Sequence, residues 1–333
     1  MYIMSVWLQV FDFYRYHCEN NADFLRKFND IPFQRIANYS NPYGETIKNT
    51  DMIESNDQVN ELTAMYTNNN LVSFRPGIVE ISFALSYKFN IYLPNHLRNK
   101  LHLDKYIKEN AGLYYKNNHR RAEVLQWWTE HFVDLIQHST YTSCYNILHT
   151  DLVILSVLDR KSTLYNYEHL HKIILKHSEG KKILYVGNAV DSIRAGYDRG
   201  LQNVWKFSVS NFSMYYLKTP QTTPGNVYPH DTMIETCDDI IRQIDSNYSD
   251  FDTAIFGCGA YGSSLINILR KKYPQKNLIY LGSDCFKMFG VKLNFQPWEI
   301  YDSNVNKYAI IDIVDSLPDG CKNHPEKKYW KLP

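Results

Sequence analysis

Hydrophobic and polar positions in the second half of the chain follow two alternating periods. Helix-length segments carry apolar residues every three or four positions, as at Ile240, Ile241 and Ile244. Between them lie four largely apolar runs with the length of buried strands: residues 183–186, 204–209, 252–256 and 278–281. Strands that alternate with helices predict βαβ units with right-handed crossovers. We therefore expect an α/β fold, a Rossmann-like open, mostly parallel sheet with helices on both faces.

The first 70 residues lack this alternation. Their apolar positions keep helix spacing, but a turn at Pro42 and Gly44 and a polar stretch at residues 49–60 interrupt them. From residue 71 the pattern changes to a short strand at 71–74, an amphipathic helix around Trp128 and an apolar run at 151–158. We expect residues 1–70 to form a helical accessory segment and residues 71–333 to form the main domain.

The run at 252–256 leads directly into a glycine-rich turn, Gly257-x-Gly259-x-x-Gly262, and a helical pattern follows it. This context is typical of a phosphate-binding loop, because glycines let the backbone approach a ligand and a helix N-terminus offers N–H groups. A tight turn without a ligand can have the same spacing. Tyr261, within the turn, is a candidate for stacking on a nucleotide.

The carboxyl ends of the four predicted strands are all small or polar. These ends are Gly187 and Asn188, residues 208–210, residues 257–259, and Gly282, Ser283 and Asp284. Ligands bind beyond the carboxyl ends of the strands in an open α/β sheet, so we expect these segments to line one site. The Thr- and Pro-rich residues 218–230 lie between a strand and a helix, and we expect them to form a mobile loop over the ligand.

A second candidate patch follows the strand at 71–74. Arg75, Gly77 and Glu80 come at its end, and Glu80 has apolar neighbours. One interpretation is a glutamate in the first turn of a helix, where the helix dipole favours it. The other is a carboxylate held in a cleft, where partial burial raises its pKa toward the range of a general base.

Composition narrows the function classes. A formal net charge of +1 gives no basic surface for nucleic acid or for an anionic membrane. The six cysteines form no C-x-x-C pair, which suits a reducing compartment. The apolar start at residues 2–13 is too short and too polar for a membrane span or a signal peptide, so we expect a cytoplasmic protein. His169 and His171 are two positions apart, which is no metal-ligand spacing on a helix.

Residues 71–292 of the 333 resemble the bacterial glycosyltransferases of the GT-D fold, a family first catalogued as a domain of unknown function. The resemblance rests on residues 256–262, 279–282, 289–290, 183–187, 192–193 and 110–113, and on Arg75-x-Gly77-x-x-Glu80. It implies transfer of a sugar from a nucleotide-sugar donor to a glycan or another hydroxyl acceptor. The residues expected to bind the donor are Arg75, Gly77, Gly187, Asn188, Gly257, Gly259, Tyr261, Gly262, Gly282 and Ser283. We expect Glu80 to be the catalytic base, with Asp284 as its substitute.

The sequence departs from this family at one position that bears on a metal. Family members carry Asp-x-Glu after the arginine and glycine, and that motif helps to hold a divalent cation on the donor diphosphate. Here the aspartate position is Ile78, which leaves Glu80 alone. Magnesium and manganese prefer several oxygen ligands, so the sequence does not firmly imply either metal as a cofactor.

Two other functions fit the same residues. In a nicotinamide-dependent oxidoreductase, Asp284, about 20 positions after Gly262, would bind the ribose of the cofactor. A glycine turn that comes so late in the chain is unusual for such a domain. In a catalytically inactive relative of the glycosyltransferases, the cleft would only bind a partner or a glycan.

Overall fold

The structure is a computed structural model of the chain, and it describes residues 56–77, 80, 83–84, 107–109, 111–143, 164–165, 170–222, 228–293 and 304–316. Within these residues the main feature is a seven-stranded sheet in the order β3-β2-β1-β7-β6-β4-β5. Every pairing in it is parallel. The expected α/β fold with an open parallel sheet is confirmed.

The strands of this sheet are β1 (Val72–Phe74), β2 (Tyr141–Ser143), β3 (Leu164–Tyr165), β4 (Lys182–Gly187), β5 (Ser213–Lys218), β6 (Thr253–Gly257) and β7 (Asn277–Tyr280). A separate parallel pair joins β8 (Val291–Lys292) to β9 (Ile311–Asp312). The sequence correctly predicted β1, β4, β6 and β7. The apolar run at 151–158 lies outside the described residues.

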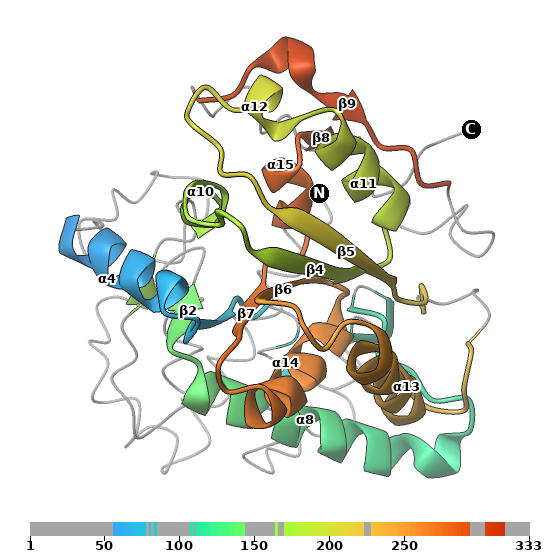
Figure 1. Cartoon of the computed structure of the whole chain (residues 1–333). Helices are drawn as coiled ribbons and strands as arrows, with labels where there is room; N and C mark the ends of the chain where they lie inside the picture. The colour runs from blue at the N-terminus through green and yellow to red at the C-terminus, as the bar shows by residue number, and fades with distance from the viewer. Residues whose placement is uncertain are drawn as a thin grey trace, which may run out of the picture.

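Helices cover both faces of the sheet (Figure 1). One face carries α8 (Arg121–His138), α13 (Met233–Asn247) and α14 (Ala260–Lys272), and the other carries α4 (Asn56–Thr67), α10 (Leu170–Lys176), α11 (Val190–Asp198) and α15 (Asp284–Met288). Short helices complete the description: α12 (Leu201–Val204), η3 (Asn118–Arg120) and η5 (Lys307–Ala309). None of these described helices is long and apolar enough to cross a bilayer.

The side chains of β4 show why both faces are covered. Leu184 and Val186 belong to the core beneath α8, α13 and α14, whereas Ile183 and Tyr185 belong to the core on the opposite face. All four are fully buried. A strand buried on both faces reads as a continuous apolar run, which is what the sequence shows at 183–186.

The last helix of the expected accessory segment is part of this core. Tyr66 in α4 is fully buried, and its hydroxyl shares a hydrogen bond of 2.5 Å with the Ser178 hydroxyl after α10. The Asn277 side chain at the start of β7 donates to the Tyr66 carbonyl over 2.9 Å. Residues 56–67 therefore pack as one unit with the sheet, and residues 1–55 lie outside the described part of the chain.

The prediction of a strand at residues 204–209 is wrong. Val204 ends α12, and Trp205 is buried against His171 with their rings 5.0 Å apart. The apolar and polar residues alternate here because Trp205 and Phe207 pack on α10, with Lys176 over the Phe207 ring. The edge strand that pairs with β4 is instead β5, which begins at Ser213. Its side chains are partly exposed, as is usual for a strand at the edge of a sheet.

Strand order also fixes where a ligand would bind. The chain passes from β4 through α11 to the edge strand β5, and then returns through α13 to β6 on the other side of β4. The order of the strands reverses between β4 and β6. In open α/β sheets, ligands bind in the crevice outside the carboxyl ends of the strands at this reversal.

Candidate functional site

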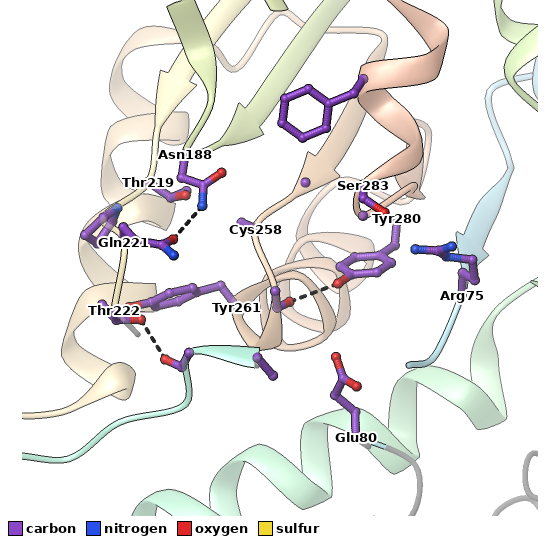
Figure 2. Close-up of a pocket in the computed structure, with 17 residues that line it drawn as sticks. Arg75, Glu80, Asn188, Thr219, Gln221, Thr222, Cys258, Tyr261, Tyr280 and Ser283 are labelled. Atoms are coloured by element: carbon purple, nitrogen blue, oxygen red, sulfur yellow. Dashed lines mark hydrogen bonds between the residues drawn. The ribbon is translucent and has the colours of Figure 1, made fainter. Parts of the chain in front are cut away.

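A cleft, here called the central cleft, lies at this reversal and takes residues from the ends of five strands (Figure 2). Its lining comprises Arg75 and Glu80 after β1, Asn188 after β4, residues 219–222 after β5, residues 257–259 and Tyr261 after β6, Tyr280, Gly282, Ser283 and Phe286 from β7 onward, and Ala111 and Gly112. The structure thus brings together most of the residues that the sequence singled out. Four of the expected site residues are not among the lining residues: Gly77, Gly187, Gly262 and Asp284.

The glycine turn owes its sequence partly to packing within the chain. Gly259 has φ +57° and ψ −139°, a backbone conformation that side chains disfavour, and a Cβ there would lie 2.5 Å from the Ala111 carbonyl oxygen. A Cβ on Gly262 would lie 2.3 Å from the Tyr280 ring, so this glycine lets α14 pack on β7. Only Gly257, Cys258 and Gly259 of the turn face the cleft, together with Tyr261.

Glu80 is the acidic side chain of the described cleft lining. It has helical backbone and is partly exposed in the cleft, and Gly77 lets its carboxylate pack against the chain. Burial raises the pKa of Glu80 above its usual 4.5, and the positive charge of Arg75 opposes this rise. Glu80 thus lines the cleft from a helical backbone, so both interpretations from the sequence stay open.

Arg75 and Asp284 form a buried ion pair beside Glu80. The guanidinium Nη1 donates to Asp284 Oδ2 over 2.7 Å, and both side chains are about nine-tenths buried. Gly282, with φ +56°, makes room for this guanidinium, since a Cβ there would lie 2.6 Å from Nη2. Asp284 therefore holds Arg75 at the cleft rather than facing the cleft itself.

Tyr280 is a cleft residue that the sequence analysis missed. Its hydroxyl donates to the Gly259 carbonyl over 3.3 Å, and its ring packs edge-on against Phe74 at 5.6 Å. Burial and the nearby Glu80 carboxylate raise the pKa of Tyr280. Tyr280 is the last residue of the apolar strand β7. From the sequence it is therefore indistinguishable from a core residue, and nothing indicates that its hydroxyl reaches the glycine turn after the neighbouring strand β6.

Residues 219–222 form one wall of the cleft, within the segment that the sequence analysis expected to lie over the ligand. The Thr222 hydroxyl donates to the Gly112 carbonyl over 2.6 Å and accepts from the Tyr261 hydroxyl at 3.0 Å. Asn188 donates to Gln221 Oε1 over 2.6 Å. The described beginning of the expected loop is thus a hydrogen-bonded wall in which Thr219 and Thr222 are buried, and residues 223–227 lie outside the described part.

The contacts of Tyr261 bear on its expected role. Its side chain is almost fully buried, and its hydroxyl is engaged with Thr222. In Figure 2, Tyr261 lies beside Thr222 in the lining of the cleft. Tyr261 therefore holds the wall formed by residues 219–222, and little of its ring surface is open for stacking on a nucleotide.

The described side chains do not fit a magnesium or manganese site. Glu80 is one carboxylate, and its neighbour Arg75 is a cation. Across the described residues, no group of three or more His, Cys, Asp and Glu side chains could hold a metal ion. Ile78 and His169 lie outside these residues, and His171 is buried beside Trp205.

Comparisons with protein-family models, with curated proteins and with solved structures found no match. The side chains and backbone groups of the cleft therefore carry the argument about its ligand. It offers the N–H groups of a glycine turn at the start of α14, a buried cation at Arg75, and a carboxylate with a raised pKa at Glu80. This combination suits an anionic ligand whose reaction requires removal of a proton.

Proposed function

We propose that the protein is a glycosyltransferase similar to the GT-D group, with a nucleotide-sugar donor and a glycan or another hydroxyl compound as acceptor. The observation that carries this proposal is the partly buried Glu80 carboxylate in the same cleft as the glycine turn of residues 257–259. Transfer of a sugar needs a site for the donor diphosphate, stabilisation of the leaving charge and a base for the acceptor hydroxyl.

The diphosphate would lie at the turn that leads from β6 into α14. The backbone of Gly257, Cys258 and Gly259 faces the cleft there, and the N-terminal end of a helix carries a partial positive charge. The neighbouring Cys258 thiol is no competing nucleophile, since burial raises its pKa. Arg75 adds a fixed positive charge across the cleft, held in place by Asp284.

Glu80 would act on the acceptor. As the acceptor oxygen forms its bond to the anomeric carbon, the bond from that carbon to the diphosphate oxygen breaks, and the acceptor proton passes to the Glu80 carboxylate. A raised pKa makes Glu80 a stronger base near neutral pH than an exposed glutamate. The negative charge leaves with the nucleoside diphosphate, where the glycine turn and Arg75 stabilise it.

The alternative of a nicotinamide-dependent oxidoreductase loses its main support. Its ribose ligand would be Asp284, and that carboxylate is bound to Arg75 behind the cleft lining. A catalytically inactive relative that only binds a glycan or a partner is favoured by one observation, the single carboxylate of the described lining. Turnover separates this alternative from the enzyme.

The direct test is a thermal-shift and calorimetric screen of the purified chain against nucleoside diphosphates and nucleotide sugars, with and without added Mg²⁺ or Mn²⁺. A specific ligand at a hundred times its Kd stabilises the folded state by about 2.7 kcal/mol. We expect one nucleotide class to stabilise the protein and its sugar conjugate to release that nucleoside diphosphate slowly. Stabilisation by NAD(H) or NADP(H) alone would contradict the proposal.

A further inference from the structure

A second hollow, here called the lateral hollow, adjoins the central cleft on the side of β5. The two share Asn188, Thr219, Pro220 and Gln221 as a common wall. Beyond this wall, the lateral hollow is bounded by Asp239 on α13 and by Asp315 in the C-terminal segment. In Figure 2, Glu80 lies on one side of the central cleft, and Asn188, Thr219 and Gln221 lie on the other. The lateral hollow therefore opens from the end of the cleft that is remote from Glu80.

The charge of the lateral hollow differs from that of a phosphate site. Three carboxylates line it, those of Asp191, Asp239 and Asp315. Two of them have a cation nearby, since Lys218 lies 3.5 Å from Asp191 and Arg242 lies 3.1 Å from Asp239, so Asp315 carries the excess negative charge. An excess of carboxylates repels phosphate. It favours ligands that donate hydrogen bonds, and the diol of a ribose is such a ligand in dinucleotide-binding folds.

Asp315 occupies a helix end that could otherwise bind an anion beside the lateral hollow. Its carboxylate Oδ2 accepts from the Ser192 backbone N–H over 2.7 Å and also from the Ser192 hydroxyl. Ser192 lies in the first turn of α11, the helix that follows strand β4. The helix end that could bind an anion there is thus occupied by the protein's own carboxylate. Both bonds are to Oδ2, which leaves Oδ1 to accept from a ligand in the hollow.

The wall between the two hollows holds an independent sign of a ligand. Thr219 is 2% exposed, and its hydroxyl has no hydrogen-bond partner within the described part of the chain. A buried hydroxyl without a partner is costly unless something binds it. Thr219 lines both the central cleft and the lateral hollow, so a ligand that spans the two would pass beside it.

We propose that the lateral hollow is the nucleoside end of the donor site, with the ribose hydroxyls bound by Asp315. This inference rests on the proposed function, and it specifies which way the donor lies along the cleft. The diphosphate lies over residues 257–259, the sugar points to Glu80, and the ribose passes Thr219. The base lies among Pro220, Pro229 and Ile240, whose apolar surfaces also line the hollow.

The test compares ADP, GDP, CDP and UDP with their 2′,3′-dideoxy analogues by calorimetry on the full chain. Because hydrogen bonds to charged groups are strong, we expect the best ribonucleotide to bind the wild type at least about tenfold more tightly than its dideoxy analogue. Asp315→Asn should lose most of this preference, because its neutral amide no longer offers the charged acceptor that makes these hydrogen bonds strong. Asp312→Asn, an exposed position on β9 in the same segment, should keep the wild-type preference.

The outcomes separate this inference from the proposed function. Equal binding of ribose and dideoxyribose nucleotides to the wild type would overturn the nucleoside assignment and leave the glycosyltransferase proposal standing. The comparison on the wild type decides this even where Asp315→Asn fails to fold. A wild type that binds none of the four nucleoside diphosphates would overturn both proposals.

Discussion

The guanidinium of Arg75 lies 2.7 Å from the carboxylate of Asp284, a residue 209 positions later in the chain. The pair joins the end of β1 to the start of α15 across the carboxyl end of β7. It places a buried positive charge beside Glu80 and removes Asp284 from the cleft lining. Asp284 is thus a positioning residue for Arg75.

The first prediction concerns this pair. Asp284→Asn leaves a buried guanidinium without its counter-charge, which typically costs about 3–5 kcal/mol. We expect the lower end of this range, because Glu80 also faces Arg75. Urea unfolding measures the loss, and Asp250→Asn in the exposed pair with Lys182 is the control, which should change stability far less because solvent screens that pair.

The same variant tests the role of Asp284 in binding. Asp284 does not line the cleft, so it acts on a bound nucleotide only through Arg75. In Asp284→Asn the amide oxygen can still accept from Arg75 Nη1 and keep the guanidinium in place. Calorimetry on the folded fraction of Asp284→Asn should therefore show nucleoside diphosphate binding about as tight as in the wild type, whereas a loss of tenfold or more for NAD(H) would support the ribose ligand that the oxidoreductase alternative requires.

The second prediction concerns Gly259. From the sequence, Gly259 was expected to leave space for a ligand at the backbone of the turn. The structure changes this expectation, because a Cβ at Gly259 meets the Ala111 carbonyl oxygen at 2.5 Å. Gly259→Ala should therefore destabilise the whole domain by more than about 2 kcal/mol, measured by urea unfolding.

Gly180→Ala is the matched control for Gly259→Ala. Gly180 also has a positive φ, +68°, but a Cβ there would meet no atom within 4 Å. Its substitution should cost only the backbone strain, about 1 kcal/mol. Equal losses of stability at the two positions would mean that the contact with Ala111 is unimportant.

The third prediction is a pH dependence of stability. Burial raises the pKa of Glu80 above 4.5, so between these two pKa values the folded state keeps a proton that the unfolded chain has lost. The contribution of Glu80 to stability is therefore fully present below the unfolded pKa and is lost as pH rises through the folded pKa. Relative to the wild type, Glu80→Gln should gain stability as pH rises above about 4.5, by about 1.4 kcal/mol for each unit of pKa rise.

Glu123→Gln is the control for this pH series. The hydrogen bonds that Glu123 accepts from Arg120 lower its pKa, so its contribution to stability appears as pH rises and is lost in acid. Its variant should therefore lose stability relative to the wild type as pH rises, with the sign opposite to that of Glu80→Gln. Unfolding midpoints at pH 4 to 8 measure both, and parallel curves for Glu80→Gln and the wild type would refute burial of Glu80.

The sequence was a good guide to the central sheet and to the position of the site. Runs such as 183–186 are buried on both faces of the sheet, so their pattern depends on burial alone and can be read without knowing the neighbours. The parallel order then brings Asn188, Gly257 and Gly282 to one edge. The misplaced strand at 204–209 shows the limit, because its alternation reflects tertiary packing of Trp205 and Phe207 on α10.

The contacts within the site depended on pairings between distant segments. Nothing local in the sequence indicates that Ala111 fills the space above Gly259, or that Thr222 joins Tyr261 to Gly112. Likewise, Asp315 reaches the first turn of α11 from 123 positions away. Glycine spacing predicted the turn but could not distinguish space for a ligand from space for the protein's own chain.

Glu80→Gln, assayed for donor affinity and turnover together, tests the central claim most directly. With the nucleotide sugar that binds the wild type, calorimetry should give an affinity within about twofold, a difference of less than 0.5 kcal/mol. Release of the nucleoside diphosphate, with water or an alcohol as acceptor, should fall on the order of 10²–10⁴-fold, because an amide cannot accept the proton. Wild-type turnover in Glu80→Gln would contradict the assignment of Glu80 as the base and the glycosyl-transfer mechanism built on it.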